Sequence, residues 1–444
     1  MAHSGGGRKL NRRQFLRRAA AVAAGVSGFP YVVPGRALGL DGATAPSERI
    51  TVGFIGMGRM AAGHLGAYLG DPSCQVLAIC DVERNRRERR AAEVNTAYAA
   101  RAEQGAYYAC DNYGDHRDLC AREDIDAVVI ATPNHWHALN AVEALNRGKD
   151  VYLEKPLART VHECRAVVEA ARRNGRILQT GSQQRSDSTF RLACELARNG
   201  RIGEVREVHA NVGGPPNEDN LPGEPAPEGL DWDMWLGPCA PRPYSSVLAP
   251  PESWDGWPEW RYYRPYAGGL MTDWGAHHFD IAQWGLGMDG SGPVEVIPPM
   301  PDNPDVKMLT YVYANGVKLY RGAGQINGAG VEFVGTKGRI GVNRGGFLVT
   351  EPASLRHETI GPGETRLYNS PDHRLNFLES VRTGREPVCP AEVGCSSAVV
   401  CHIGNIAHWL QRPLKWDPAG GVFVDDPEAN RLLSRAMRAP WQLA

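Results

Sequence analysis

A glycine-rich turn directly after a short apolar run constrains the fold of this chain more than any other feature. The run "ITVGFIG" leads into residues Gly56–Ala61, which have the spacing G-x-G-x-x-A, and a helical pattern follows at once. In such a turn the first glycine allows a tight bend, the second lets the backbone approach a diphosphate, and the last small residue keeps the helix close to the strand. The helix N-terminus then faces the phosphate charge. The turn therefore predicts the first βα unit of a dinucleotide-binding domain.

One acidic residue, Asp81, indicates which dinucleotide this turn would hold. It ends the second apolar run, 25 residues after Gly56. An acid at about this distance typically binds the ribose hydroxyls of the adenosine half, and its charge would repel the 2′-phosphate of NADP. Arg84, Arg86 and Arg87 follow closely and offer cations to such a phosphate. We therefore predict NAD as the cofactor, with NADP as the alternative.

The pattern downstream of the turn divides the chain into two domains. Apolar runs alternate with helical patterns at first, which indicates a parallel sheet with helical crossovers. Later runs alternate apolar and polar residues between glycine turns, which indicates a mostly antiparallel, open sheet. The sequence thus predicts an α/β fold, with a Rossmann doubly wound parallel sheet over residues 47–180 and an α+β domain over residues 181–444. Helices within residues 371–444 are expected to pack back across both domains.

One segment of the second domain, residues 213–264, differs in composition from its surroundings. It holds 11 of the 32 Pro and 5 of the 11 Trp residues. A long irregular stretch inside a compact chain is usually functional or disordered, and this many aromatic side chains argue against disorder. Trp faces suit the apolar faces of sugar rings, and they suit a subunit interface equally well. Both interpretations stay open at this point.

The first 46 residues have the composition of a targeting segment. Residues 1–39 contain seven Lys or Arg and no acidic residue, and Arg12–Arg13 stand shortly before Phe15–Leu16 and a short apolar stretch. This arrangement resembles a twin-arginine export signal. We predict a twin-arginine-type signal and linker over residues 1–46, and hence a periplasmic or cell-envelope location. A disordered basic arm is the alternative, and whether the signal is cleaved or kept as an anchor stays open.

Charge and cysteine content argue against several classes of function. Without the basic leader the chain carries 42 Lys or Arg against 50 Asp or Glu, and so acidic a body disfavours binding to nucleic acid or to anionic membranes. The ten cysteines show neither CxxC pairs nor metal-ligand spacing, and we expect buried thiols instead. Outside the leader no segment is long and apolar enough to span a membrane.

Three further motifs complete a set that is similar to one known family. They are Ala131-Thr132-Pro133-Asn134 with His137, Glu154-Lys155-Pro156, and "GGLMTDWGAHHFD" at residues 268–280. Together with the glycine turn, and in this order, these motifs resemble those of the glucose–fructose oxidoreductase / inositol dehydrogenase (Gfo/Idh/MocA) family. The resemblance covers most of the chain after residue 50. It implies an NAD(P)-dependent oxidoreductase that acts on the CH–OH group of a sugar, glycoside or cyclitol.

The resemblance also implies roles for four residues. Lys155 reaches the substrate hydroxyl, and Glu154 lies near the cofactor. His277 is the acid/base toward the carbinol and shares proton shuttling with Lys155, while Asp273 orients His277 or binds a neighbouring hydroxyl. Because Asp273 and His277 are four residues apart, we expect them on one helix face. These roles need no metal, and none is predicted.

The remaining site predictions come from position along the chain. Gln183 and Arg185 follow the last predicted strand of the first domain, where substrate is expected at the domain junction, and a charged packing role is the alternative for Arg185. The predicted cofactor-binding residues are Gly56, Gly58, Arg59, Met60, Ala61, Asp81, Thr132, Pro133, Asn134, His137, Glu154, Lys155 and Gln183. The predicted catalytic residues are Lys155, Asp273 and His277, and the predicted substrate-binding residues are Arg185, Asp273 and His277.

Export would constrain how such an enzyme turns over. Because little free NAD is available outside the cytoplasm, we expect a tightly bound cofactor and a redox cycle that closes within the active site. One such cycle couples oxidation of one sugar to reduction of another. The other is glycoside cleavage through transient oxidation of a ring carbon, but the relatives associated with it differ at Glu-Lys-Pro, so the oxidoreductase interpretation leads.

Two further expectations concern a non-enzymatic function and the oligomeric state. A cofactor-binding sensor on the same fold is a third hypothesis, and the joint presence of Lys155, Asp273 and His277 disfavours it. Family members commonly pair through the open face of the second sheet. We therefore expect a homo-oligomer.

Overall fold

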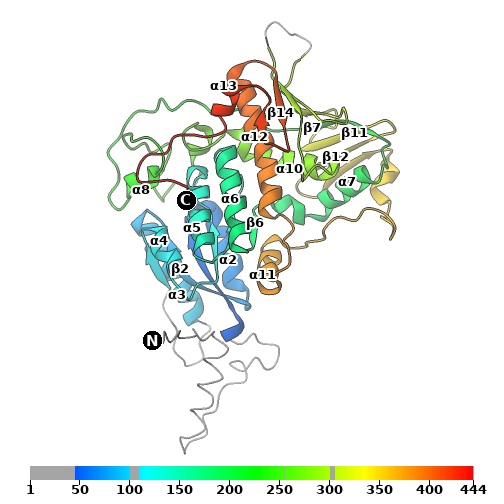
Figure 1. Ribbon diagram of the computed structural model, residues 1–444. Helices are drawn as coiled ribbons and strands as arrows, with labels where there is room; N and C mark the ends of the chain where they lie inside the picture. Colours follow the sequence, from blue (N-terminus) through cyan, green and yellow to red (C-terminus); the bar gives the residue numbers. More distant parts are fainter. Residues whose placement is uncertain (1–45, 101–109, 255, 301–305, 444) are drawn as a thin grey trace, which may run out of the picture. The chain divides into compact units, whose positions relative to one another are not determined.

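The structure is a computed structural model that describes residues 46–100, 110–254, 256–300 and 306–443 (Figure 1). Met1–Glu48 and Arg49–Ala444 form separate units, and the second unit contains both sheets. The predicted export signal, residues 1–46, lies outside the described residues apart from its last position. Within the described ranges, no helix combines the length and apolarity that crossing a membrane requires.

The first sheet has six parallel strands in the order β3-β2-β1-β4-β5-β6. They are β1 (Ile50–Ile55), β2 (Cys74–Cys80), β3 (Asp111–Tyr113), β4 (Ala127–Ile130), β5 (Asp150–Leu153) and β6 (Leu178–Thr180). β4 and β5 are buried along their whole length, as a parallel sheet covered by helices on both faces requires. The strand order reverses between β1 and β4, and α/β sheets bind ligands at the carboxyl ends of strands at such a point. The predicted Rossmann sheet is confirmed, and β3 is an additional strand.

Helices connect these strands and cover the sheet (Figure 1). They are α2 (Arg59–Gly70), α3 (Arg84–Ala99), α4 (His116–Cys120), α5 (Asn134–Asn146) and α6 (Val161–Asn174). Local signals explain where they begin and end. The Glu83 carboxylate accepts hydrogen bonds from the first backbone N–H groups of α3, and Thr160 caps α6 in the same way. α6 ends at Gly175, whose φ of 58° lies in the left-handed region.

The second sheet has nine strands in the order β13-β12-β11-β7-β10-β9-β8-β14-β15. They are β7 (Val205–Ala210), β8 (Glu295–Ile297), β9 (Thr310–Val312), β10 (Lys318–Arg321), β11 (Val331–Gly335), β12 (Arg339–Asn343), β13 (Phe347–Glu351), β14 (Leu414–Asp417) and β15 (Val422–Phe423). Only β7 and β10 pair in parallel; the other described pairs are antiparallel. The predicted mostly antiparallel sheet is confirmed, and the short strands β8, β14 and β15 extend one edge.

The helices of the second domain pack on this sheet and on the first domain. They are α7 (Ser188–Arg198), α8 (Trp232–Leu236), α9 (Leu270–Asp273), α10 (Gly275–Leu286), α11 (His373–Thr383), α12 (Ala391–Leu410) and α13 (Pro427–Arg431). Phe279 of α10, Phe333 of β11 and Ile403 of α12 share one buried core. α12 also packs along α6 (Figure 1), so one helix contacts both domains. The predicted boundary at residue 180 stays a prediction.

The Pro- and Trp-rich segment, residues 213–264, lies against the first domain; we call it the strap. Leu230 of the strap forms an antiparallel bridge with Glu83, just beyond the carboxyl end of β2. The carbonyl oxygen of Trp235 accepts a hydrogen bond from Nε2 of His135 on α5 (2.8 Å). These contacts attach the strap beside the edge of the first sheet where ligands bind.

Four of the five tryptophans of the strap form two groups that differ in exposure. Trp232 and Trp235 stack with ring centroids 4.7 Å apart, and Trp235 is buried against α5, so this pair holds the strap in place. Trp254 and Trp257 are 41% and 48% exposed. Only the second group leaves indole faces open to a ligand or a partner.

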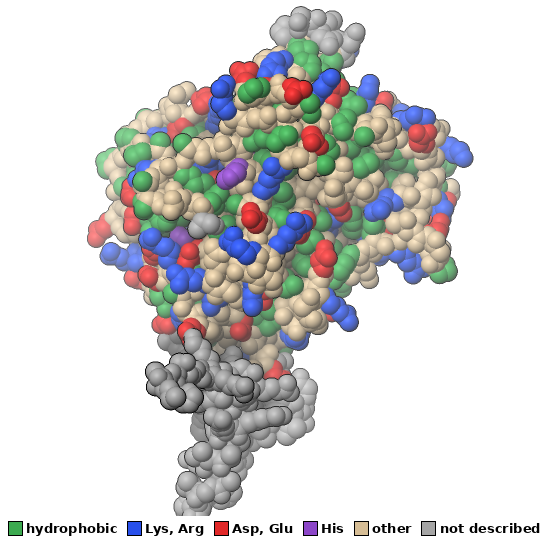
Figure 2. All heavy atoms as spheres, in the orientation of Figure 1, with side chains coloured by type: hydrophobic (Ala, Val, Ile, Leu, Met, Phe, Trp, Pro, Cys, Tyr) green, Lys and Arg blue, Asp and Glu red, His purple; other side chains and the backbone are tan. Residues whose placement is uncertain are grey.

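The surface carries both signs of charge. Figure 2 shows Lys and Arg side chains interspersed with Asp and Glu over the described part of one face, without a broad basic patch there. Binding to nucleic acid usually needs such a patch. The expectation that this chain binds no nucleic acid stays a prediction.

Candidate active site

The predicted cofactor turn follows β1 and opens α2. Gly56 has a φ of 82°, and a Cβ there would lie 2.9 Å from backbone atoms of Thr132, so this position requires glycine. Gly58 is the N-cap of α2; it provides no side-chain cap, and the space that its Cβ would occupy has no atom within 4 Å. An uncapped helix N-terminus with open space before it suits a diphosphate. The described residues therefore fit a dinucleotide.

Asp81 lies directly beside this turn. Its Oδ2 accepts from the backbone N–H of Met57 (2.7 Å), and its Oδ1 accepts from that of Glu83 (2.9 Å). Arg86 Nη1 lies 3.6 Å from Oδ1, and Arg87 donates to the Asp81 carbonyl oxygen (3.2 Å). Two of the three arginines offered as ligands of a 2′-phosphate are therefore engaged with Asp81 itself. This arrangement favours NAD.

The turn after β4 brings Thr132 against Gly56 and leads into α5. Both ring nitrogens of His137 face backbone carbonyl oxygens, with Nδ1 2.8 Å from that of Pro156 and Nε2 2.9 Å from that of Thr132. Burial lowers the pKa of His137, and its two hydrogen bonds to the backbone oppose that shift. Because neither nitrogen is left for a ligand, the predicted cofactor contact of His137 is replaced by a positioning role between two loops. The roles of Thr132, Pro133 and Asn134 toward the cofactor stay predictions.

Glu154, directly after β5, is buried in a hydrogen-bond network that the sequence analysis did not foresee. Its Oε1 accepts from Nε2 of His64 on α2 (2.8 Å) and from Nε2 of Gln183 (2.8 Å). Arg374 on α11 donates to Nδ1 of His64 (2.9 Å), which keeps the His64 proton on Nε2. Burial would raise the pKa of Glu154, but the hydrogen bond from His64 and the charge of Lys155 lower it below its ordinary value. Glu154 is therefore an ionised carboxylate.

Lys155 reaches across to the second domain. Its Nζ donates to Oδ1 of Asp273 (2.7 Å) and to the carbonyl oxygen of the same residue (2.9 Å). Burial would raise the pKa of Asp273, but the positive charges of Lys155, Arg261 and Arg344 lower it. α9 ends at Asp273 and α10 begins two residues later, so the predicted common helix face with His277 is wrong. Asp273 positions Lys155, and this pairing replaces the predicted orientation of His277.

His277 lies in the first turn of α10. Its Nδ1 is buried and has no hydrogen-bond partner among the described residues. Burial and the positive charges of Lys155 and Arg344 hold the pKa of His277 well below its ordinary value. A neutral imidazole with a free nitrogen can accept a proton. The neighbouring His278 instead bonds through Nδ1 to the carbonyl oxygen of Asn211 (2.8 Å), a structural role.

Arg185 has a structural role rather than the predicted substrate contact. Its side chain is 2% exposed, and its Nε donates to Asp280 Oδ2 (2.8 Å). Its two terminal nitrogens donate to the carboxylate of Asp289 (2.7 and 3.0 Å), and its guanidinium lies 5.0 Å from the ring centre of Trp284. All three nitrogens of this guanidinium therefore donate to protein carboxylates. The alternative of charged packing describes it better.

Besides the residues bonded to Glu154, four residues at the site were not predicted. Arg261 and Trp257 come from the strap, whose composition had marked the segment without identifying these positions. Trp274 stands between the helices that carry Asp273 and His277, and its indole lies 4.8 Å from the guanidinium of Arg344. Arg344 lies in the turn between β12 and β13, where no sequence signal distinguishes it from other surface arginines. The four residues that were not predicted are thus Trp257, Arg261, Trp274 and Arg344.

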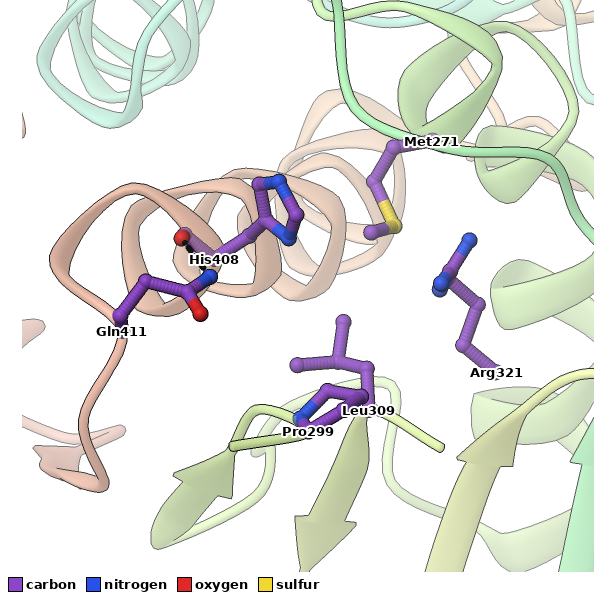
Figure 3. Close-up of a pocket in the computed structure, with 6 residues that line it drawn as sticks. All are labelled: Met271, Pro299, Leu309, Arg321, His408 and Gln411. Atoms are coloured by element: carbon purple, nitrogen blue, oxygen red, sulfur yellow. Dashed lines mark hydrogen bonds between the residues drawn. The ribbon is translucent and has the colours of Figure 1, made fainter. Parts of the chain in front are cut away.

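A separate cavity of about 140 Å³ lies behind α9 (Figure 3). Its lining residues are Met271, Pro299, Leu309, Arg321, His408 and Gln411. Gln411 Nε2 donates to the His408 carbonyl oxygen (2.5 Å) at the end of α12, as Figure 3 shows. None of the predicted site residues lines this cavity, so it is distinct from the candidate active site. In the described ranges, no three His, Cys, Asp or Glu side chains form a group able to hold a metal ion.

Replacing Gly56 with alanine is expected to weaken NAD binding. A non-glycine residue at this φ costs about 1–3 kcal/mol, and the new Cβ would also press on Thr132. We expect the NAD dissociation constant to rise about 10- to 100-fold, measured by titration of the apoprotein. Gly63→Ala in α2 is the matched control, because a Cβ there meets no atom within 4 Å. Unchanged affinity in Gly56→Ala would disprove the assigned turn.

Models of two domains of one oxidoreductase family match the chain. Residues 50–182 match its NAD-binding Rossmann fold, and residues 216–443 match its C-terminal alpha/beta domain. Among solved structures, an oxidoreductase domain protein from Kribbella flavida is 20% identical with a TM-score of 0.55, covering 83% of this chain and 99% of that one. That similarity concerns the fold.

Curated relatives match over shorter regions. A "Glycosyl hydrolase family 109 protein" from Shewanella putrefaciens is 30% identical over 207 residues, which is 44% of each chain. An "Inositol 2-dehydrogenase" from Salmonella paratyphi B is 33% identical over 162 residues, 36% of this chain and 45% of the relative. The chain thus spans less than half the length of these relatives. Because the two family models together match nearly all of the chain from residue 50 onward, the protein belongs to the Gfo/Idh/MocA oxidoreductase family.

Proposed function

We propose that this protein is an NAD-dependent oxidoreductase that acts on the CH–OH group of a sugar, glycoside or cyclitol. The observation that carries this proposal is the pair formed by Lys155 and Asp273, with the neutral His277 in the next helix. Glu154, the neighbour of Lys155, is bonded to His64 of α2, the helix that opens at the cofactor turn. The residues proposed to transfer protons are therefore connected to the cofactor turn through Glu154 and His64, which are hydrogen-bonded to each other.

Each residue of this site has a definite task in the proposed reaction. Gly56, Gly58 and Asp81 would hold the dinucleotide, whose nicotinamide, when bound, takes up the hydride from the substrate carbon. Lys155 Nζ, the ammonium group that Asp273 keeps in place, donates a hydrogen bond to the substrate oxygen. It passes one of its own protons to the ring nitrogen of His277 as it takes up the proton of the substrate hydroxyl, so Lys155 ends as an ammonium group again and His277 holds the proton.

The cofactor is proposed to stay bound through the catalytic cycle. This part rests on the expected export to the periplasm or cell envelope, where released NAD would be lost. The strap supports retention, because it is attached beside the carboxyl ends of the first sheet through Leu230 and Trp235. Its Trp257 also lies 5.6 Å from the guanidinium of Arg59 in the cofactor turn.

Retention is tested by releasing the cofactor from purified protein with acid. We expect close to one NAD(H) per chain after extensive dialysis, identified by absorbance and mass. Trp257→Ala removes the strap's contact with Arg59 and is expected to lower the retained fraction. Trp254→Ala, on a similarly exposed strap residue, is the control. A wild-type protein that loses its NAD on dialysis would contradict the closed-cycle proposal.

Glycoside cleavage through transient oxidation is the second candidate. The observation that favours it is the match to the family 109 glycosyl hydrolase from Shewanella putrefaciens. In this reaction, oxidation of a ring carbon acidifies the neighbouring C–H, which permits elimination of the glycosidic substituent before the carbon is reduced again. The presence of Glu154-Lys155-Pro156 favours the first candidate, as the family resemblance of this motif implies.

A substrate panel separates the two candidates. Holoprotein is incubated with sugars, cyclitols and aryl glycosides while absorbance at 340 nm and product release are followed together. The oxidoreductase proposal expects absorbance to rise with a keto product and no released aglycone. Aglycone release without net change at 340 nm would establish cleavage instead. If no member of the panel gives either signal, both candidates fail.

A further inference from the structure

Two arginines that the proposed mechanism does not use reach the candidate active site from different elements. Arg261 lies in the strap, and its Nε is 3.8 Å from Oδ2 of Asp273, buried and without a hydrogen-bond partner among the described residues. Arg344 lies in the β12–β13 turn. With the Gln184 amide turned so that both of its ends are satisfied, its oxygen accepts from Arg344 Nε (3.2 Å) and its nitrogen donates to the carbonyl oxygen of His277 (3.0 Å). Both cations therefore border the Asp273–His277 region.

Exposed indoles hold the two guanidinium groups from one side. Arg261 lies 5.2 Å from the ring centre of Trp257, and Arg344 lies 4.8 Å from that of Trp274. The two rings are 48% and 38% exposed. A guanidinium stacked on an aromatic face keeps its edge donors free, and those donors fit a planar anion in two parallel hydrogen bonds. In the described part of the chain, the terminal nitrogens of neither arginine donate to protein.

The charges around the site do not balance. The charges that act on Asp273 and Arg344 are those of Lys155, Arg261 and Arg344 against those of Asp273 and Glu154. This set leaves one positive charge without a partner, and the neutral His277 adds none. Arg344 is exposed, so its terminal nitrogens are accessible to an anion from solvent. A single excess charge matches a monoanion better than a phosphate dianion.

We propose that the substrate carries a carboxylate, which Arg344 binds together with Arg261. The substrate class is then an acidic sugar or cyclitol of the uronate type, and this inference rests on the proposed oxidoreductase function. Arg344 supplies two parallel N–H donors to the carboxylate, and the exposed indole of Trp274 beside it offers an apolar face to the ring.

The experiment compares ligands that differ in charge alone. Methyl glycosides of hexoses, the corresponding uronic acids and their uncharged methyl esters are offered to the holoprotein, and reduction of bound NAD is followed at 340 nm. We expect the second-order rate constant for reduction of bound NAD by the best acid to exceed that by its ester at least about tenfold. Arg344→Gln is expected to bring this acid-over-ester ratio close to one, chiefly by weakening binding of the acid. Arg261→Gln is expected to change the ratio in the same direction.

Controls separate charge from folding and from the reaction itself. Arg356→Gln, on an exposed arginine of the 3₁₀ helix Ala353–His357, should leave both rate and ratio unchanged. Arg344→Lys keeps the charge without the paired donors and should give an intermediate ratio. An acid-over-ester ratio near one, or a ratio unaffected by Arg344→Gln, would overturn the carboxylate inference while the oxidoreductase proposal stands. A preference for hexose 6-phosphates over uronates would also overturn it, and no NAD reduction by any probe would overturn both proposals.

Discussion

Replacing Lys155 with alanine is expected to lower the rate of substrate oxidation by about 10²- to 10⁴-fold. The variant loses the ammonium group that Asp273 holds at 2.7 Å and that shares the proton of the substrate hydroxyl. It also leaves the Asp273 carboxylate without its closest cation, beside the oxygen that must become negative as the C–H bond breaks. The measurement is single-turnover reduction of bound NAD at 340 nm, with each rate normalised to the NAD content of the preparation.

Two variants make this result interpretable. Lys415→Ala changes an exposed lysine on β14 and should keep the wild-type rate. Lys155→Arg keeps a positive charge opposite Asp273, but a guanidinium does not give up its proton, so this variant should remain slow if Lys155 relays a proton. A rate for Lys155→Ala within about threefold of wild type would remove Lys155 from the catalytic residues.

Replacing Arg185 with methionine is expected to lower the free energy of unfolding by about 3–5 kcal/mol. The variant leaves the fully buried carboxylate of Asp280 without the Nε donor at 2.8 Å, and it releases Asp289. The measurement is urea unfolding followed by fluorescence. The double variant Arg185→Met with Asp280→Asn removes the buried charge as well and should recover part of the loss.

The pH dependence of this loss has a definite sign. Burial raises the pKa of Asp280, and the charge of Arg185 opposes that shift, so the pKa must rise further when the cation is removed. A raised folded-state pKa means that ionisation costs stability as pH increases through it. The difference between Arg185→Met and wild type should therefore be largest at neutral pH and shrink toward acidic pH. If Arg185→Met instead keeps wild-type stability and raises KM, the substrate role predicted from sequence is right.

The features of the fold that could be predicted are those whose cause is local. Gly56 requires a left-handed conformation within one turn, and β1, β2 and β4 are largely apolar runs, so both features are visible in the sequence. β3, β8 and β15 have three residues or fewer and exist because a neighbouring strand pairs with them. The break between α9 and α10 at Trp274, directly before Gly275, was likewise not predicted.

The residues of the candidate active site likewise divide into those that a sequence motif indicates and those that only tertiary contacts bring together. Glu154, Lys155, Asp273 and His277 belong to contiguous motifs, and the structure brings Lys155 and Asp273 into contact across 118 residues. His64 and Arg374 are bonded to each other across 310 residues, and neither belongs to a recognisable pattern. The charge of Arg185 was visible in the sequence, but its carboxylate partners depend on how α10 packs. The residue type indicates which interactions a side chain can make, and only the tertiary structure decides with which neighbour it makes them.

The position of the strap has a consequence for protein engineering. Residues 213–264 belong by sequence to the second domain, yet they attach beside the carboxyl edge of the first sheet and carry Trp257 to the cofactor turn. A chimera joined at residue 180 would therefore combine the dinucleotide-binding domain of one parent with the strap of the other. The unit that can be exchanged between relatives is discontinuous in sequence, and a workable graft must transfer both pieces from the same parent.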